Sequence, residues 1–324
     1  MPEGGSMPEG ASLGEGGSLP EALALRWVPG DGPIDIRPLA KGLVNASYRV
    51  ARGGCMYSLR VAAGHCADLG LDRSWECRVL RAASALQLSP PVFECDPSSG
   101  VIVAGWLDGR EWTPEEAMRP AAQDAIANLL RRVHALPIPG PARALSPADW
   151  IAHYSRALDR RGGALPEPAA LSAAAEEQLA IVDSLGPVTP VVCHSDLHCQ
   201  NLLLCNPAPT SPAAQPDAAG AAGARVRLVL LDWEYAHVSD PLWDVVGWAG
   251  NNDWEMTRTQ ALLSTYLQRA PRSAELRRLG ALAWLYDYVC LLWSQLYVNL
   301  RDSPDNAWVA ARAEQLRERL RSLR

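Results

Sequence analysis

Two short segments constrain the fold of this chain more than any other part of its sequence. The first, VVCHSDLHCQNLLL (191–204), places Asp196 and Asn201 between two apolar runs. The second, LVLLDWEYA (228–236), places Asp232 directly after an apolar run. Because short apolar runs bounded by polar residues are typical of buried strands, we expect these polar side chains to lie at neighbouring strand ends.

The polar groups of the two segments suit metal-dependent phosphoryl transfer. Glu234 follows Asp232 by two residues and supplies a further carboxylate. In this chemistry one acid accepts the proton of the attacking hydroxyl, while an amide and other acids hold Mg²⁺ against the nucleotide phosphates. The sequence therefore predicts a phosphotransferase that uses a nucleotide and Mg²⁺.

Composition and charge exclude several classes of protein. The 324 residues are 48% hydrophobic, carry a formal net charge of -6 and contain no apolar run of membrane-spanning length. A nucleic-acid-binding protein would want a basic face, which nothing in this sequence supplies. Residues 1–20 are rich in Gly, Ser and Glu and lack the basic-then-apolar order of a signal peptide, so we predict a disordered tail. We expect no nucleic-acid partner and no membrane insertion.

The cysteines predict a cytoplasmic protein with reduced thiols. The eight cysteines are scattered and form no C-x-x-C pair, and no export signal precedes them. Cys193, Cys199 and Cys205 flank the first motif at even spacing, but zinc sites usually show closer ligand pairs. Packed thiols are therefore favoured over a metal site there.

The hydrophobic pattern divides the chain into a small α+β lobe and a larger helical lobe. Residues 34–62 alternate apolar and polar positions as antiparallel strands do, and residues 71–88 have the spacing of an amphipathic helix. SPPVFECD and GVIVAGWL predict two more strands. We assign residues 21–104 to a nucleotide-binding lobe and residues 105–324 to a catalytic and substrate-binding lobe.

The second lobe is expected to be mainly helical, with the two motif segments interrupting it as short strands. The expected helices are 114–135, 168–185, 255–269, 273–300 and 305–323. Between the motifs, residues 206–225 are rich in Pro, Ala and Gly and offer little to bury, so we predict a mobile loop.

The segments CHSDLHCQNLLL and LLDWEYA resemble the signature of a known family. They are similar to the choline kinase and thiamine kinase branch of the aminoglycoside phosphotransferase-like superfamily, which shares the protein-kinase-like fold. The resemblance extends from about residue 34 over nearly the whole chain and is strongest over residues 191–244. It implies a two-lobed α+β enzyme that uses ATP and Mg²⁺.

The resemblance assigns a role to each polar residue of the two motifs. Asp196 matches the catalytic acid that orients the substrate hydroxyl and accepts its proton. Asn201, Asp232 and Glu234 match the metal ligands. His194 matches a histidine that opens the catalytic loop and is expected to be a structural hydrogen-bonding residue.

Three further positions carry expectations from the same resemblance. Asp244 is expected to cap the catalytic loop rather than to take part in the chemistry. His198 departs from the glutamine of choline kinases and could orient the loop or touch a phosphate. The backbone around Ala104–Trp106 is expected to meet adenine at the hinge between the lobes.

The nucleotide site also needs a turn over the phosphates, a cation on the following strand and a helical acid to hold that cation. The turn KGLVN offers Gly42 and Asn45 as donors near phosphate, although it is not a G-x-G-x-x-G loop. Lys41 is the only lysine of the chain and lies in this turn, so the strand cation must be an arginine, which YSLRV supplies as Arg60. Glu76 on the following helix is the expected partner of Arg60.

The substrate prediction depends on aromatic residues of the segment 281–299. The sequence spacing suggests that Trp284, Tyr288, Trp293 and Tyr297 lie broadly on one helix face, with Asp287 adding negative charge. Such a wall could hold a quaternary ammonium by cation–π attraction. An aromatic stripe at helical spacing is also typical of a hydrophobic core, so both interpretations stay open.

Two more aromatic residues, Trp233 and Tyr235, flank Glu234 and could line the same cavity. The sequence as a whole predicts an ATP- and Mg²⁺-dependent kinase of a small alcohol that carries an amine, with choline, thiamine and ethanolamine as candidates. An aminoglycoside or sugar phosphotransferase of the same fold is the alternative, and a nucleotide-binding pseudokinase is a third.

Overall fold

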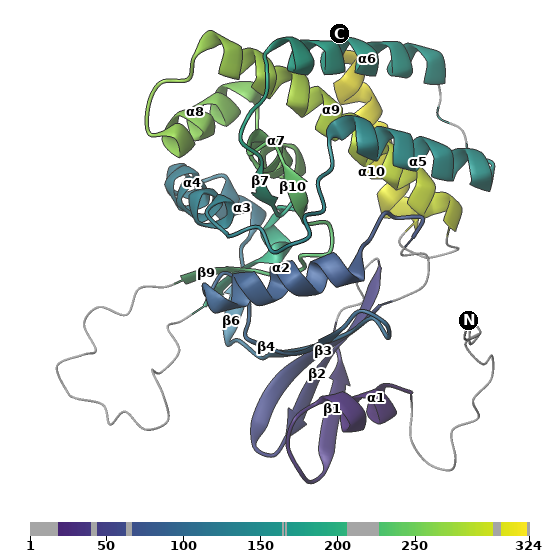
Figure 1. Cartoon of the computed structure of the whole chain (residues 1–324), viewed down its shortest axis with the longest axis vertical. Helices are drawn as coiled ribbons and strands as arrows, with labels where there is room; N and C mark the ends of the chain where they lie inside the picture. Colours follow the sequence, from purple (N-terminus) through teal and green to yellow (C-terminus); the bar gives the residue numbers. More distant parts are fainter. Residues whose placement is uncertain are drawn as a thin grey trace, which may run out of the picture.

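The computed structural model describes residues 19–39, 44–62, 67–163, 165, 167–205, 227–300 and 306–322. The predictions made for residues 1–18 of the tail, for Lys41 and Gly42, and for the loop 206–225 lie outside these residues, whereas residues 19 and 20 of the predicted tail are the start of a helix. Within the described part, the chain forms two lobes, with a β-sheet at one end and a group of helices at the other (Figure 1).

The first lobe is a five-stranded antiparallel sheet in the order β1-β2-β3-β5-β4. Its strands are β1 (Ile34–Pro38), β2 (Asn45–Arg52), β3 (Cys55–Ala62), β4 (Val92–Asp96) and β5 (Val101–Gly105). Alternating residues such as Val50, Leu59 and Val103 are fully buried on one face, where helix α1 (Leu19–Trp27) contributes Ala24. The antiparallel strands expected from the sequence are confirmed.

Helix α2 (Arg73–Ala85) lies across the middle of the molecule between the sheet and the helical lobe (Figure 1). It begins at the N-cap Asp72, whose side chain accepts a hydrogen bond from the backbone N–H of Trp75 at 2.9 Å. Trp75 and Val79 are fully buried, and the indole of Trp75 donates to the carbonyl of Ala236 in the other lobe at 2.8 Å. The amphipathic helix predicted here is therefore confirmed, and its apolar face connects the lobes.

One prediction about the cysteines is wrong. Cys77 of α2 and Cys95 of β4 form a disulfide, with their Cα atoms 5.7 Å apart. The two residues are 18 positions apart in sequence, and only the packing of α2 against β4 brings them together. Cys193, Cys199 and Cys205 are buried free thiols, in agreement with the expectation of packed thiols beside the catalytic motif.

The second lobe is mainly helical. Its helices are α3 (Pro114–Ala117), α4 (Pro120–His134), α5 (Pro147–Arg161), α6 (Pro168–Ser184), α7 (Leu242–Asn251), α8 (Met256–Leu267), α9 (Ser273–Leu300) and α10 (Asn306–Ser322). Helix α9 contacts α5, α6, α7, α8 and α10 and is the centre of this lobe. The sequence predicted most of these helices but not α5 or α7. The start of α5 carried a signal, since Ser146 and Asp149 form a capping box.

Short strands carry the motif segments into the space between the lobes. Strand β7 (Val191–Cys193) pairs with β10 (His237–Ser239), and β8 (Leu202–Cys205) lies between β6 (Gly109–Glu111) and β9 (Arg227–Leu230). The backbone N–H of Leu230 donates to the carbonyl of Leu88 in the first lobe at 2.8 Å. None of the helices in the described part of the chain is long and apolar enough to cross a membrane.

Candidate active site

The loop between β7 and β8 is held by the buried carboxylate of Asp244. Its oxygens accept hydrogen bonds from the backbone N–H of His194 at 2.9 Å and of Ser195 at 2.8 Å. Nε2 of His134 lies 3.0 Å from the same carboxylate. Burial alone would raise the pKa of Asp244, but the hydrogen bond and the charge of His134 outweigh it, and the pKa is lowered. The prediction that Asp244 caps the catalytic loop is confirmed.

Asp196 follows directly and is oriented by its neighbours in the loop. Ser195 has a φ of 70°, and this left-handed turn redirects the chain after His194. The side-chain amide of Asn201 donates to the carbonyl of Asp196 at 2.9 Å and to Oδ2 of its carboxylate at 3.0 Å. Nε2 of His194 lies 2.9 Å from the carbonyl of Leu231, so His194 is a structural hydrogen-bonding residue as expected.

His198 lies beside the carboxylate of Asp196, with its Nε2 3.6 Å from Oδ2. Burial favours a higher pKa for Asp196, but the charge and hydrogen bond of His198 outweigh this and lower the pKa. The same interaction, against the effect of burial, raises the pKa of His198. The pair therefore keeps Asp196 ionised, which a proton acceptor requires.

Asp232 and Glu234 follow strand β9 and face the first lobe. Asp232 has a φ of 55°, a left-handed conformation that aspartate tolerates, and Trp233 behind it is fully buried. Nη1 of Arg60 donates to Oδ1 of Asp232 at 2.5 Å, and Nη2 of Arg60 donates to Glu76. The predicted pair of Arg60 with Glu76 is thus confirmed, and Arg60 also reaches across the lobes to Asp232.

Arg73, which the sequence analysis missed, extends this arrangement. Its Nη1 donates to Oε2 of Glu76 at 2.8 Å and to Oε2 of Glu234 at 2.9 Å. Three carboxylates and two guanidinium groups therefore alternate in the order Asp232, Arg60, Glu76, Arg73 and Glu234. The available signal was that Arg73 precedes Glu76 by three residues at the start of a helix, where the two side chains are neighbours.

Asn45 joins the same network. Its Nδ2 donates to Oε2 of Glu234 at 2.8 Å, and its Oδ1 accepts from Nη2 of Arg73 at 3.0 Å. The side chain of Asn45 is therefore hydrogen-bonded to both the carboxylate of Glu234 and the guanidinium of Arg73. Its expected contact with phosphate stays a prediction.

The carboxylates offer a site for a hard cation. One oxygen from each of Glu76, Asp232 and Glu234 lies within 4.8 Å of the others. Burial, followed by the charge of Asp232, raises the pKa of Glu234 to about 7, and burial also raises the pKa of Asp232. Acids that repel one another in this way gain from a divalent cation, and carboxylate and amide oxygens are the ligands that Mg²⁺ prefers. The residues present therefore fit the predicted metal.

The aromatic residues of α9 do not form the single wall predicted from the sequence. Trp284 packs against Tyr288 and Trp293 stacks on Tyr297, with ring centroids 5.4 and 5.2 Å apart. The nine residues from Trp284 to Trp293 advance a helix by about two and a half turns, so the two pairs point to opposite sides of α9. The five-residue step from Tyr288 to Trp293 breaks the common face.

The pair formed by Trp293 and Tyr297 is the one that lies toward the motif segments. Nε1 of Trp293 donates to the hydroxyl of Tyr235 at 2.7 Å, and both of these side chains are partly exposed. Burial raises the pKa of Tyr235, and the charges of Glu234 and Asp196 are close enough to add to the effect. Trp233, in contrast, belongs to the core.

Asp287 is not available to a substrate in the arrangement seen here. Its side chain is buried and accepts a hydrogen bond from Nε of Arg319 in α10 at 2.7 Å. Trp284, Tyr288 and Tyr297 are also buried, at 3%, 4% and 1% exposure. The structure places these four side chains in the packing of the helical lobe, and their contact with a substrate stays a prediction.

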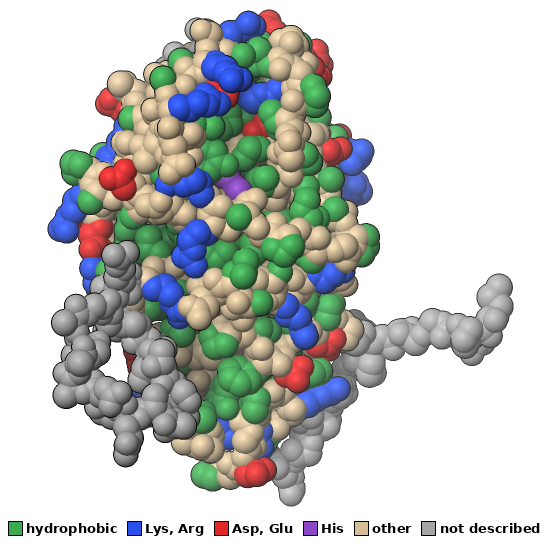
Figure 2. All heavy atoms as spheres, turned by 60° about the vertical axis from the view of Figure 1, so that its left-hand side comes forward, with side chains coloured by type: hydrophobic (Ala, Val, Ile, Leu, Met, Phe, Trp, Pro, Cys, Tyr) green, Lys and Arg blue, Asp and Glu red, His purple; other side chains and the backbone are tan. Residues whose placement is uncertain are grey.

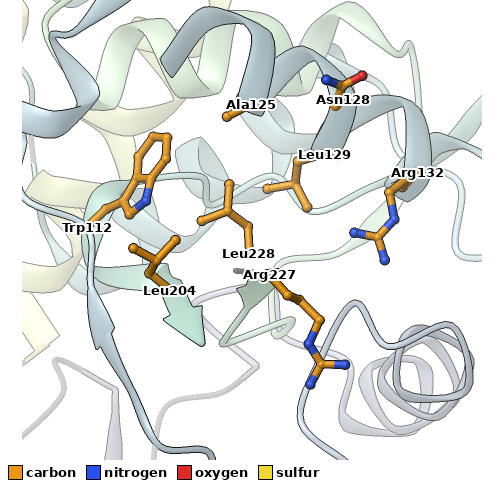
Figure 3. A pocket seen from close by; sticks show the side chains of 8 residues that line it. All are labelled: Trp112, Ala125, Asn128, Leu129, Arg132, Leu204, Arg227 and Leu228. Carbon is orange, nitrogen blue, oxygen red and sulfur yellow. The ribbon is translucent and has the colours of Figure 1, made fainter. Parts of the chain in front are cut away.

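A cavity of about 450 Å³ lies apart from the predicted site residues, beside helix α4 and strands β8 and β9. Leu129, Leu204 and Leu228 line it, with Arg132 and Arg227 at its edge (Figure 3).

On the face drawn in Figure 2, basic and acidic side chains are interspersed rather than collected in one basic area.

The two-lobed fold and the acids between the lobes define the class of protein as a kinase-like phosphotransferase. A sequence model described as the Phosphotransferase enzyme family matches residues 35–210, which is more than half of the chain. The chain therefore belongs to this family, and the resemblance identified from the two motifs is confirmed. No curated protein sequence matches the chain.

Solved structures with the same fold include a choline/ethanolamine kinase family protein and a choline kinase. A choline/ethanolamine kinase family protein from Mesorhizobium loti has a TM-score of 0.68 and 21% identity, covering 94% of this chain and 95% of its own. The choline kinase LicA from Streptococcus pneumoniae has a TM-score of 0.69 and 18% identity, covering 94% and 99%. The predicted α+β, protein-kinase-like fold is confirmed.

The same fold is found in an aminoglycoside phosphotransferase. The aminoglycoside phosphotransferase APH(4)-Ia has a TM-score of 0.58 and 18% identity, covering 92% of this chain and 97% of its own. The structural relatives thus span both substrate classes that the sequence analysis considered. Their identities are too low to choose between these classes.

Proposed function

We propose that the chain is an ATP- and Mg²⁺-dependent kinase that phosphorylates the hydroxyl of a small cationic alcohol, with choline, ethanolamine and thiamine as candidates. The observation that carries this proposal is the position of Asp196. Its carboxylate is held by Asn201 at 3.0 Å in the loop between β7 and β8. The segment after β9 carries the acids that pair with Arg60 and Arg73, and it also carries Tyr235, which hydrogen-bonds Trp293 of α9. A phosphate site and an aromatic substrate site would therefore share one proton acceptor.

The residues of the loop support a role for Asp196 as the base. Its carboxylate is ionised because His198 lowers its pKa against the effect of burial. Asn201 holds one carboxylate oxygen, and no described residue donates to the other, so this second oxygen can accept a hydrogen bond from an alcohol. In this role Asp196 would align the hydroxyl with the terminal phosphate and take its proton as the phosphorus–oxygen bond forms.

The nucleotide and metal would be held by the acids and cations of the two lobes. Asp232, Glu234 and the side-chain oxygen of Asn201 would hold Mg²⁺, which when bound neutralises charge on the phosphates. Arg60 would contact a phosphate, and its planar guanidinium suits two oxygens at once. LicA, which shares the fold, has been solved in complex with AMP, and this supports an adenine nucleotide.

The substrate class follows from the aromatic side chains. Trp293 and Tyr235, which are partly exposed, would contact a quaternary or protonated amine through their ring faces, each contributing about 0.5–2 kcal/mol, with the buried ring of Tyr297 stacked behind Trp293. A polycationic aminoglycoside would need several exposed acids along its length, whereas Asp287 is already paired with Arg319. The aromatic residues therefore favour a small cation over the aminoglycoside alternative.

A coupled assay of ADP release tests the proposal with ATP, Mg²⁺ and five acceptors: choline, ethanolamine, thiamine, a hexosamine and kanamycin. Turnover with choline, ethanolamine or thiamine alone supports the proposed substrate class. Turnover restricted to kanamycin or the hexosamine would keep the phosphotransferase and overturn the substrate class. Tight ATP binding without turnover on any of the five acceptors would contradict the proposal and favour a pseudokinase.

A further inference from the structure

The guanidinium group of Arg73 connects three parts of the chain that are distant in sequence. It belongs to α2, yet it bonds Glu234 after β9 at 2.9 Å and Asn45 at the start of β2 at 3.0 Å. It also bonds Glu76, one turn further along its own helix, at 2.8 Å. Only 10% of the Arg73 side chain is exposed, so these contacts are shielded from water.

The contacts leave Glu234 with one fixed oxygen and one available oxygen. Oε2 of Glu234 accepts from both Arg73 and Asn45, while Oδ1 of Asp232 accepts from Arg60. In the described part of the chain, no donor is bonded to Oε1 of Glu234 or to Oδ2 of Asp232. Each acid is therefore anchored by the first lobe through one oxygen and can offer the other to an ion.

The charge of Arg73 is needed for this arrangement. Glu76, Asp232 and Glu234 bring three carboxyl groups within 4.8 Å of one another, and Arg60 pairs with only two of them. Buried like charges disfavour one another strongly. Without Arg73, Glu234 would keep only the neutral amide of Asn45 as a partner and would turn away from Asp232.

We propose that Arg73 is a positioning residue for the metal of the active site. It fixes Glu234 by one oxygen so that the other oxygen can bind the ion together with Asp232. Because Arg73 is part of α2, it also makes metal binding depend on the contact between the two lobes. This inference rests on the proposed kinase function, and groups that orient metal ligands in this way typically change metal affinity about 10–100-fold when they are removed.

Electron paramagnetic resonance of Mn²⁺ tests the inference without turnover, because the signal of free Mn²⁺ reports the unbound fraction. The full chain is titrated with Mn²⁺ in the presence of the non-hydrolysable nucleotide AMP-PNP. Arg73→Met should weaken Mn²⁺ binding at least about tenfold. Arg73→Lys keeps the positive charge but loses the planar guanidinium, so its Mn²⁺ affinity should lie between those of Arg73→Met and the unchanged protein. Arg81→Met removes an exposed arginine from the same helix and should bind Mn²⁺ as the unchanged protein does.

A second comparison separates positioning from a merely structural effect. In a Glu234→Gln background, Arg73→Met should weaken Mn²⁺ binding less than about threefold, because the carboxylate that Arg73 positions has already been removed. An unchanged Mn²⁺ affinity in Arg73→Met, or an undiminished loss in the Glu234→Gln background, would overturn the inference. Absence of any Mn²⁺–AMP-PNP complex with the unchanged protein would contradict the proposed function itself.

Discussion

Two helices contribute side chains to the candidate active site, and they do so by opposite chemistry. Helix α2 brings the charged residues Arg73 and Glu76, which are satisfied by partners on other elements. Helix α9 brings Trp293 and Tyr297, whose rings stack on each other. Charged side chains in a buried site must find specific partners, whereas aromatic rings can pack in a core or line a cavity with similar ease. For this reason the positions of the charged residues of α2, the charged side of the site, are more constrained than those of the rings of α9, the aromatic side.

The catalytic loop lies between these two sides, and its acid should show the largest effect. Asp196→Asn removes the proton acceptor but keeps the shape and the hydrogen bond from Asn201, so kcat should fall about 10³-fold. Nucleotide affinity, measured by calorimetry, should change little. Asp124→Asn, an exposed acid on α4, is the matched control. Full activity of Asp196→Asn would remove Asp196 from the mechanism.

On the charged side, Arg60→Met should destabilise the fold. The substitution leaves Glu76, which is 1% exposed, with Arg73 as its remaining cationic partner in the described residues. Breaking a buried pair from one side costs about 3–5 kcal/mol, which urea unfolding can measure. Adding Glu76→Gln should restore part of this loss by removing one of the negative charges that Arg73 alone would have to compensate. Equal stability of Arg60→Met and the unchanged protein would mean that the charged side is less constrained than the comparison of helices implies.

On the aromatic side, Trp293→Leu should affect binding more than folding. Loss of a cation–π contact should raise the KM for a cationic substrate by up to about tenfold with little change in kcat. Trp284→Leu, on the other side of α9 and 3% exposed, should lower the Tm instead and leave the KM unchanged. If both variants lowered the Tm and neither changed the KM, the rings of α9 would all belong to the core.

The smallest expected effect is a pH dependence of the free energy of unfolding that arises from the titration of Glu234. Its pKa is raised in the folded chain to about 7 by burial and by Asp232, so the folded state binds a proton that the unfolded state releases near pH 4.5. In the absence of metal, the free energy of unfolding should therefore decrease as the pH rises from about 5 to about 7. Glu234→Gln should show a shallower decrease in urea unfolding at pH 5, 6 and 7. An identical slope in both proteins would show that Glu234 keeps its ordinary pKa.

The difference between the two sides also explains which site residues could be proposed from the sequence. Asp196, Asn201, Asp232 and Glu234 could be selected because each occupies a fixed place relative to an apolar strand, and phosphoryl transfer requires those residue types. Arg60 could be selected because the chain offers no lysine on that strand. These arguments use only local order along the chain, and the structure brings the selected groups to the boundary between the lobes.

The places where the structure differs from the expectations involve partners from distant parts of the chain. Asp287 was expected to face a substrate, but Arg319 of α10 neutralises it. Cys77 and Cys95 were expected to be thiols, but the packing of α2 on β4 joins them. In each case the residue type was compatible with two environments, and nothing in the local sequence distinguished them.

The sequence by itself determined the family and the two-lobed fold and selected the acids of the two motifs as candidates, because strand ends, helix periodicity and residue type are properties of short segments. Only the tertiary structure decided that Arg73 anchors Glu234 and that Trp293 rather than Trp284 lies beside Tyr235. The physical reason is that the partner of a buried charge and the exposed side of a helix depend on what packs against them. Those contacts come from elements far away in the chain.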